Sequence, residues 1–211
     1  MKLKGLFSRR FLIPLGILLL VAVDPIRAEA STASEVVEEF HAALIHVMKA
    51  AETMPFAERR SHLEPFVTEK FDSTFMTRVA SGSYWREFSD DQKLELTGAF
   101  REMTLANYAS RFHGYSGQKF ETLSEKEVRG GRLFVRTRLL KSDGDVVRID
   151  YLMREKEDGW KIIDIFLDGK FSELALRRSE FSPIVRDKGY EGLLGVIKTR
   201  VADLEAGKDV D

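Results

Sequence analysis

The feature that most constrains the fold is a change of hydrophobic period in the middle of the chain. Before about residue 118, apolar residues recur every three or four positions, as in helices, whereas from there to about residue 167 they alternate. Three turn dipeptides separate the alternating segments: Gly130-Gly131, Asp143-Gly144 and Asp158-Gly159. Such dipeptides favour the tight turns that join antiparallel neighbours. The sequence therefore predicts a meander of four strands, at about 118–129, 131–142, 145–155 and 159–167.

The segment that precedes the strands is predicted to be helical. Thr32 and Glu35 have the spacing of a capping box, which marks the start of a helix. This helix should run to about Ala51, because apolar residues keep a helical period up to that point. A second capping residue, Ser89, should start another helix, which is expected to end near Phe112.

Two other helical regions contain an expected interruption. Helical segments should cover 55–79 with a break at Pro65, because proline has no amide hydrogen to donate within a helix. After the strands, closing helices are expected at 171–186 and 189–204, separated at Gly189 because glycine readily ends a helix. Helices packed on a strongly curved four-stranded antiparallel sheet make an α+β fold.

The last predicted strand, 159–167, is apolar on both faces. Strict alternation puts Trp160, Ile162 and Phe166 on one face and Ile163, Ile165 and Leu167 on the other. A strand of this kind is expected to be covered on both faces.

The first thirty residues have the pattern of a cleavable secretory signal. Basic residues precede an apolar segment, 11–23, and Ala28-Glu29-Ala30 provides the small residues that signal peptidase requires. The apolar segment is about 13 residues long, whereas a membrane-spanning helix needs roughly 20; a retained membrane anchor is the alternative. We therefore expect 1–30 to be a signal peptide, 31–205 a single domain and 206–211 a disordered tail.

Charge and cysteine content exclude several classes of protein. The full chain has a net charge of −1, and its first thirty positions hold five lysines and arginines but only two acidic residues, so the remainder is mildly acidic. Such a chain lacks the positive field that holds a nucleic-acid backbone, and nucleic-acid binding is not expected. The absence of cysteine excludes disulfides and the lipid-modified cysteine of bacterial lipoproteins.

No residue pattern indicates a metal, a cofactor or an activated nucleophile. Glu38 and His41 have the Glu-x-x-His spacing of di-metal sites in helix bundles, but such a site needs a second pair. No Gly-x-Ser-x-Gly motif is present, and without cysteine few nucleophiles remain. We expect neither a metal nor a cofactor, and we do not expect the chain to be an enzyme.

Asp164 lies among isoleucines, where burial would raise the pKa of its carboxyl group. The favoured interpretation is a structural carboxylate that accepts hydrogen bonds from backbone groups or an arginine. The alternative is the general base of an enzyme, with Tyr151 or Tyr108 as the hydrogen-bond donor.

Three arginines are expected on neighbouring strands. Arg136 and Arg138 share one face of the second strand, and Arg148 can face them from the third. We interpret them as part of a solvated outer face; guidance of an anionic head group or a partner protein is the alternative.

The strands and closing helices are rich in large apolar residues, most of which an ordinary core explains. If some of them line a cavity, its ligand must be large and apolar. A lipid with about 30 methylenes gains roughly 24 kcal/mol when it moves from water into an apolar environment. A bilayer provides about the same free energy, so the cavity of a carrier only has to bind the chains about as well as the membrane does. The candidate lipid-binding residues are Phe134, Val147, Ile149, Tyr151, Met153, Ile163, Ile165, Leu167, Phe171, Leu174, Leu193, Val196 and Ile197.

Four motifs stand out, in this order: Tyr84-Trp85-Arg86, Tyr108-Ala109-Ser110-Arg111-Phe112, Val147-Arg148-Ile149-Asp150-Tyr151 and Gly159-Trp160-Lys161-Ile162-Ile163-Asp164-Ile165. Together they resemble the MlaC, or toluene-tolerance, family, and the similarity covers essentially the whole chain after the signal. Members of that family carry phospholipid through the periplasm between an outer-membrane lipoprotein complex and an inner-membrane ABC transporter. The resemblance implies that 31–205 is a periplasmic lipid-binding domain, related in shape to NTF2-like cones, that helps to maintain the outer membrane.

One segment departs from the phospholipid carriers. Where they read Asp-Val-x-x-Glu-Gly-Val-Ser, this chain reads Asp164-Ile165-Phe166-Leu167-Asp168-Gly169-Lys170-Phe171-Ser172. This resembles the hopanoid-associated HpnM branch, which makes the ligand a phospholipid or a hopanoid and adds hopanoid-transport components as alternative partners. The other functions kept open are an enzyme that acts on a lipid-like substrate with Asp164 as base, and a non-carrying scaffold for lipid-transport or hopanoid machinery.

Overall fold

The computed structural model describes residues 31–208. The predicted signal peptide and the last three residues of the predicted tail lie outside the described residues. The elements, in chain order, are α1 (Ala33–Lys49), α2 (Phe56–Lys70), α3 (Ser73–Ser81), the 3₁₀ helix η1 (Gly82–Arg86), α4 (Asp90–Arg111), β1 (Lys119–Val128), β2 (Arg132–Leu140), β3 (Val146–Lys156), β4 (Gly159–Leu167), β5 (Phe171–Ser172) and α5 (Glu173–Glu205).

The strands form one antiparallel sheet in the order β1-β2-β3-β4-β5. The predicted α+β fold and its four-strand meander are confirmed, and the structure adds the two-residue strand β5. After β4 the chain turns back through Asp168 and Gly169, both with positive φ, so that Phe171 pairs with Leu167. The closing helix therefore begins two residues later than expected, and Ser172 caps it by accepting a hydrogen bond from the amide of Ala175.

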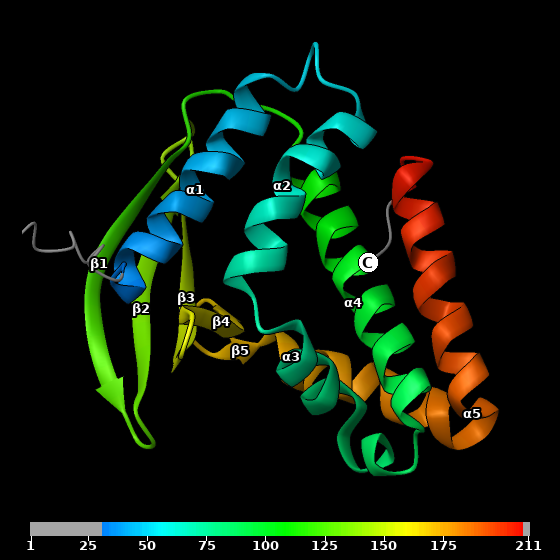
Figure 1. The fold of residues 1–211 in the computed structure, drawn as a ribbon. Coiled ribbons are helices and arrows are strands. Elements are labelled where there is room, and N and C mark those ends of the chain that lie inside the picture. Colours follow the sequence, from blue (N-terminus) through cyan, green and yellow to red (C-terminus); the bar gives the residue numbers. More distant parts are fainter. Residues whose placement is uncertain (1–30, 209–211) are drawn as a thin grey trace, which may run out of the picture.

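The helices lie on one side of the strongly bent sheet (Figure 1). Helix α1 crosses the inner face, where it contacts β1, β2 and β4. Helices α2 and α4 stand further from the strands, and α4 packs beside the C-terminal part of α5 (Figure 1). The space between the sheet and α4 is therefore bounded by elements that are far apart in the sequence.

Two capping boxes fix where the long N-terminal helices begin. Thr32 and Glu35 exchange hydrogen bonds at the start of α1, and Ser89 and Gln92 do the same at the start of α4. Both predicted helix starts are confirmed. The predicted end of α4 near Phe112 is confirmed too, because that residue is its C-cap.

The predicted break at Pro65 is wrong. Helix α2 continues through this proline to Lys70, although the carbonyl of Ser61 loses its helical partner there. Leu63 and Val67, on either side of the proline, are fully buried, and this packing keeps the segment helical.

The chain leaves the helical conformation at Phe71 instead. Its backbone is extended and forms a parallel bridge with Ile162 of β4. Asp72 follows: its amide donates to the carbonyl of Ile162 over 3.0 Å, and its side chain caps α3 through the amide of Phe75. A contact with β4, distant in sequence, thus sets the boundary between α2 and α3.

A β-bulge in β4 changes which side chains share a face. Ile165 pairs with Tyr151, but the register then shifts and Ile162, rather than Ile163, pairs with Met153. Ile162 and Ile165 therefore both belong to the core beneath the helices, although strict alternation put them on opposite faces. Ile163 is fully buried but is not part of that cluster.

Helix α5 consists of two segments joined at Gly189, whose φ of 66° and ψ of −166° are not helical. The predicted separation of two closing helices at this glycine is thus confirmed. Glycine suits the position because a positive φ strains other residues. Of the expected tail, Ala206, Gly207 and Lys208 still make backbone hydrogen bonds to the last turn of α5.

Candidate ligand cavity

A cavity of about 310 Å³ lies between the inner face of the sheet and α4. Three cross-strand pairs form its sheet wall, and each pair brings two apolar side chains to the same face. They are Leu139 with Val147, Ile149 with Leu167, and Tyr151 with Ile165.

One face of α4 forms the opposite wall. Its cavity-lining residues follow the three- and four-residue steps of a helix face: Phe100, Met103, Thr104, Asn107, Tyr108 and Arg111. Thr104 and Asn107 are polar, but each donates a hydrogen bond to the carbonyl four residues earlier in the same helix. The Thr104 hydroxyl and one of the two amide hydrogens of Asn107 therefore need no partner from a ligand.

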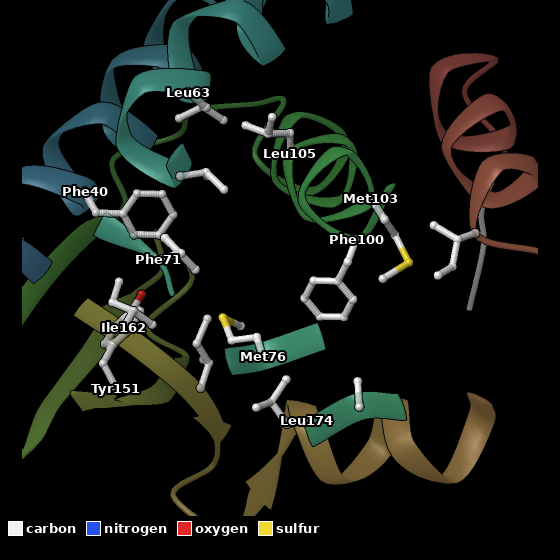
Figure 2. Packing of buried hydrophobic residues seen from close by; sticks show 14 of the residues in the cluster. Phe40, Leu63, Phe71, Met76, Phe100, Met103, Leu105, Tyr151, Ile162 and Leu174 are labelled. Atoms are coloured by element: carbon white, nitrogen blue, oxygen red, sulfur yellow. The ribbon is translucent and has the colours of Figure 1, made fainter. Parts of the chain in front are cut away.

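Residues from three further segments close the cavity. Figure 2 shows Phe71, Met76 and Leu174 around the same space into which the ring of Phe100 projects. They come from the α2–α3 junction, α3 and the first turn of α5. The side chain of Met103 points from α4 toward the C-terminal part of α5 (Figure 2).

Charged residues lie at one end of this apolar cavity. Arg111 comes from the last turn of α4, and Glu173 and Arg177 come from the start of α5. The Arg177 side chain is only 7% exposed and pairs with Glu180 over 2.7 Å and with Glu173 over 3.8 Å. Glu180 also binds Arg200 at 3.5 Å.

Tyr151 joins the cavity wall to a buried histidine on α1. Its hydroxyl lies 3.0 Å from Nε2 of His41, whose ring stacks on Phe120 at a centroid distance of 3.9 Å. Burial lowers the pKa of His41 to about 3 and raises that of Tyr151 well above its usual value. The pair is therefore neutral at physiological pH and fixes α1 against the sheet.

The buried state of His41 predicts acid sensitivity. Unfolded histidine titrates near 6.5, whereas the folded pKa is about 3. Below pH 6.5 the unfolded state binds more protons, so the stability present above pH 6.5 is lost as the pH falls toward 3. At about 1.4 kcal/mol per pH unit, we expect about 2 kcal/mol to be lost between pH 6.5 and pH 5, measured by urea unfolding.

The His41→Gln variant is the matched control. Glutamine keeps a polar group beside Tyr151 but does not titrate, so the variant should lose about 2 kcal/mol less over the same interval. His62, whose pKa is lowered by burial and by His46, is present in both proteins and cancels. Equal acid sensitivity of the two proteins would contradict the assignment to His41.

Asp164 has the contacts of a structural carboxylate. One oxygen accepts from the amides of Ile165 at 2.8 Å and Leu174 at 3.2 Å, and the other accepts from Ser172 Oγ at 2.6 Å. Burial raises its pKa, while these hydrogen bonds lower it. Asp164 connects β4 to the start of α5 and is not among the residues that line the cavity.

The structure separates the candidate lipid-binding residues into several groups. Those that line the cavity are Val147, Ile149, Tyr151, Ile165, Leu167 and Leu174. Met153, Ile163, Leu193 and Ile197 are buried elsewhere, and Val196 is on an exposed part of α5. Phe171 is 66% exposed, and Phe134 packs edge-to-face on Phe166 on the outer face of the sheet.

Sequence reasoning missed the α4 wall of the cavity. The sequence predicted a helix here but gave none of its residues a place among the candidate lipid-binding residues, although Phe100, Met103 and Tyr108 line the cavity. The polar residues Thr104, Asn107 and Arg111 lie on the same face of the helix as these apolar residues. Polar residues that recur on an apolar helix face are the sequence signal that could have indicated a cavity wall there.

The three arginines of the outer face are brought together as expected. Arg138 pairs with Arg148 in the register of β2 and β3. Each also has an acidic partner: Arg138 binds Glu121 at 2.6 Å, and Arg148 binds Asp150 through two nitrogens. Arg136 lies opposite Asp150.

Within residues 31–208, no three histidine or acidic side chains come together in a group that could hold a metal ion. Within these residues, Glu38 and His41 are therefore not joined by a third side chain that could coordinate a metal, and His41 is already hydrogen-bonded to Tyr151. None of the helices in this part of the chain combines the length and the apolar character that crossing a bilayer requires.

Comparison with known proteins identifies the family. The family model for the MlaC protein matches residues 38–199. The chain belongs to the MlaC family. The match includes all of the strands and α4, so the sheet and the helical wall of the cavity both lie in the MlaC region.

A solved structure confirms the fold of this MlaC-family chain. It is a phospholipid-binding protein from Ralstonia solanacearum in complex with a phospholipid. The TM-score is 0.73 at 18% sequence identity, over 82% of this chain and 99% of that one. A search of curated proteins finds no significant match.

Proposed function

We propose that this MlaC-family chain is a periplasmic lipid carrier, which takes lipid chains into the cavity between the sheet and α4. The observation that carries the proposal is the character of the two walls: apolar side chains from β2, β3 and β4 face apolar side chains of α4. The likeness to a phospholipid-binding protein supports it.

The energetics of transfer explain why such a site needs no strong polar contacts. Each methylene gains about 0.8 kcal/mol on leaving water, whether it enters a bilayer or a protein. A carrier that bound the chains much more tightly than the membrane could not release them. A largely apolar wall, in which the Thr104 hydroxyl and one amide hydrogen of Asn107 are already bonded within α4, meets this requirement.

The cavity must widen to hold a complete lipid. Sites for drug-sized ligands span about 300–1,000 Å³, and this one, at about 310 Å³, is at the lower end. A lipid with two chains would therefore displace side chains as it enters. Met76 and Met103 suit this role because methionine is unbranched and adapts to irregular spaces.

The ligand is a phospholipid or a hopanoid. The family assignment and the Ralstonia protein favour a phospholipid, whereas the segment from Asp164 to Ser172 resembles the HpnM branch, which stays a prediction. The partners we propose are an inner-membrane ABC transporter complex and an outer-membrane lipoprotein, or hopanoid-transport components. Export by a cleaved signal peptide would deliver the carrier to the periplasm.

The contacts of Asp164 argue against the enzyme alternative. Its two oxygens already accept three hydrogen bonds from the protein, and it does not line the cavity. Tyr108 and Tyr151 line the cavity, but the hydroxyl of Tyr151 is already bonded to His41 at 3.0 Å. A binding and transport function fits this site better than catalysis.

Lipid transfer between vesicles tests the carrier function against the scaffold alternative. Donor vesicles would hold a fluorescent phospholipid with a non-exchangeable quencher, and acceptor vesicles neither. We expect the fluorescence to rise at a rate proportional to the concentration of the protein that lacks residues 1–30. A transfer rate that does not change with the concentration of the protein would contradict the shuttle, and it is the result that a non-carrying scaffold predicts.

A further inference from the structure

We propose that Arg111, supported by Arg177, binds the phosphate group of the lipid at the charged end of the cavity. This inference rests on the proposed lipid-binding function and names the chemical class of the ligand: a lipid with a phosphate in its head group.

The charged end carries an excess of positive charge. Three guanidinium groups, on Arg111, Arg177 and Arg200, lie near two carboxylates, on Glu173 and Glu180. Burial lowers the pKa of Arg200, and the positive charge of Arg177 lowers it further. Arg111 acts in the same direction, whereas Glu180 and Glu173 oppose it, so the five groups form one electrostatic cluster.

Arg111 is the member of this cluster that a ligand can reach. It is exposed, yet it lines the cavity, which puts it where the apolar walls meet water. None of the carboxylates within residues 31–208 forms an ion pair with it, whereas Arg177 is held between Glu173 and Glu180. The excess charge of the cluster is therefore available on Arg111.

A phosphate group matches this arrangement. A guanidinium group presents paired donors that fit two phosphate oxygens, and it sheds water more easily than an ammonium group. A lipid whose chains enter between the sheet and α4 would leave its head group at the mouth, beside Arg111. Arg177, 7% exposed, also lines the cavity and is already oriented by Glu180, so its guanidinium group needs no further ordering.

The start of α5 does not provide an alternative anion site. Two amides of its first turn already have acceptors: Leu174 donates to Asp164 and Ala175 donates to Ser172. Helix N-termini bind anions through such amides only when they are unoccupied. Recognition of the head group therefore depends on the arginine side chains.

The test compares two lipids that differ only in the head group. Vesicles would contain equal amounts of phosphatidylglycerol and diacylglycerol with identical acyl chains, and the lipid on the re-isolated protein would be measured by mass spectrometry. We expect the wild-type protein to favour the phospholipid by about tenfold, the typical effect of one charge-assisted hydrogen bond. Arg111→Gln should remove most of this preference, and Arg111→Lys should restore part of it.

The control is Arg129→Gln, which removes another exposed arginine, from the β1–β2 turn, and should keep the wild-type preference. Equal loading of both lipids onto the wild-type protein, or an unchanged preference in Arg111→Gln, would overturn the phosphate site and leave lipid binding intact. If neither lipid loads, the proposed function fails. Titration with glycerol phosphate then tests the phosphate site separately from the carrier function. Binding of glycerol phosphate to the wild-type protein that is lost in Arg111→Gln supports the phosphate site. If the wild-type protein does not bind glycerol phosphate, the phosphate site is overturned.

Discussion

Replacement of Phe40 by alanine is expected to lower the free energy of unfolding by about 3–5 kcal/mol. The ring is fully buried where α1 crosses the sheet, and it packs edge-to-face on Phe71 at 5.1 Å and on Tyr108 at 4.9 Å. Phe71 is held by its bridge to Ile162, and Tyr108 is part of α4, so the surroundings cannot collapse into the space. Urea unfolding of the two proteins measures the difference.

The control for this substitution is Leu94→Ala on α4. Leu94 is 76% exposed, so its removal should change the stability by no more than about 0.5 kcal/mol. A loss below about 1 kcal/mol for Phe40→Ala would show that α1 is not packed on the sheet as described.

The Val147→Trp substitution is expected to abolish lipid binding while the protein stays folded. Val147 is half-buried on the cavity wall, opposite Leu139 in the register of β2 and β3. If the indole takes the space of about four methylenes, the lipid loses about 3 kcal/mol, which is roughly a hundredfold in Kd. The amount of lipid that purifies with each protein is the measurement, and thermal unfolding checks the fold.

The neighbouring residue provides a matched control. Val146 precedes Val147 in β3 but points to the outer face and is 54% exposed. The Val146→Trp protein should therefore retain its lipid. If both tryptophan variants bind lipid as the wild type does, the cavity between the sheet and α4 is not the lipid site.

Local sequence signals were sufficient where the structure depends on local chemistry. The capping boxes at Thr32 and Ser89, the break at Gly189 and the turns between the strands each involve residues that are neighbours in the chain. These signals predicted the order of the elements and most of their bounds. Asp164 was also interpreted correctly as a structural acceptor, because a carboxylate among isoleucines needs hydrogen-bond donors.

The failures involve contacts between distant segments. Pro65 predicted a break, but burial of Leu63 and Val67 keeps α2 helical, and the chain bends where Phe71 meets Ile162. No turn signal marks the bulge at Ile163. Strict alternation therefore assigned part of β4 to the wrong face.

The cavity could be predicted on its sheet side only. Val147, Ile149, Ile165 and Leu167 follow from alternation along β3 and β4, and they line the cavity. The α4 wall depends on how that helix is rotated about its axis, which packing against α2 and α5 determines. Single-sequence periodicity identifies an apolar face but does not say whether another side chain or an empty space lies opposite it.

Native mass spectrometry of the protein that lacks residues 1–30 tests the central claim most directly. The protein would be purified without detergent and sprayed from a volatile buffer, and the released ligand would be identified by fragmentation. We predict a bound species whose mass and fragments are those of one lipid, lost on collisional activation. A protein that shows only its own mass, and that takes up no lipid after incubation with phospholipid vesicles, would contradict the proposed carrier function.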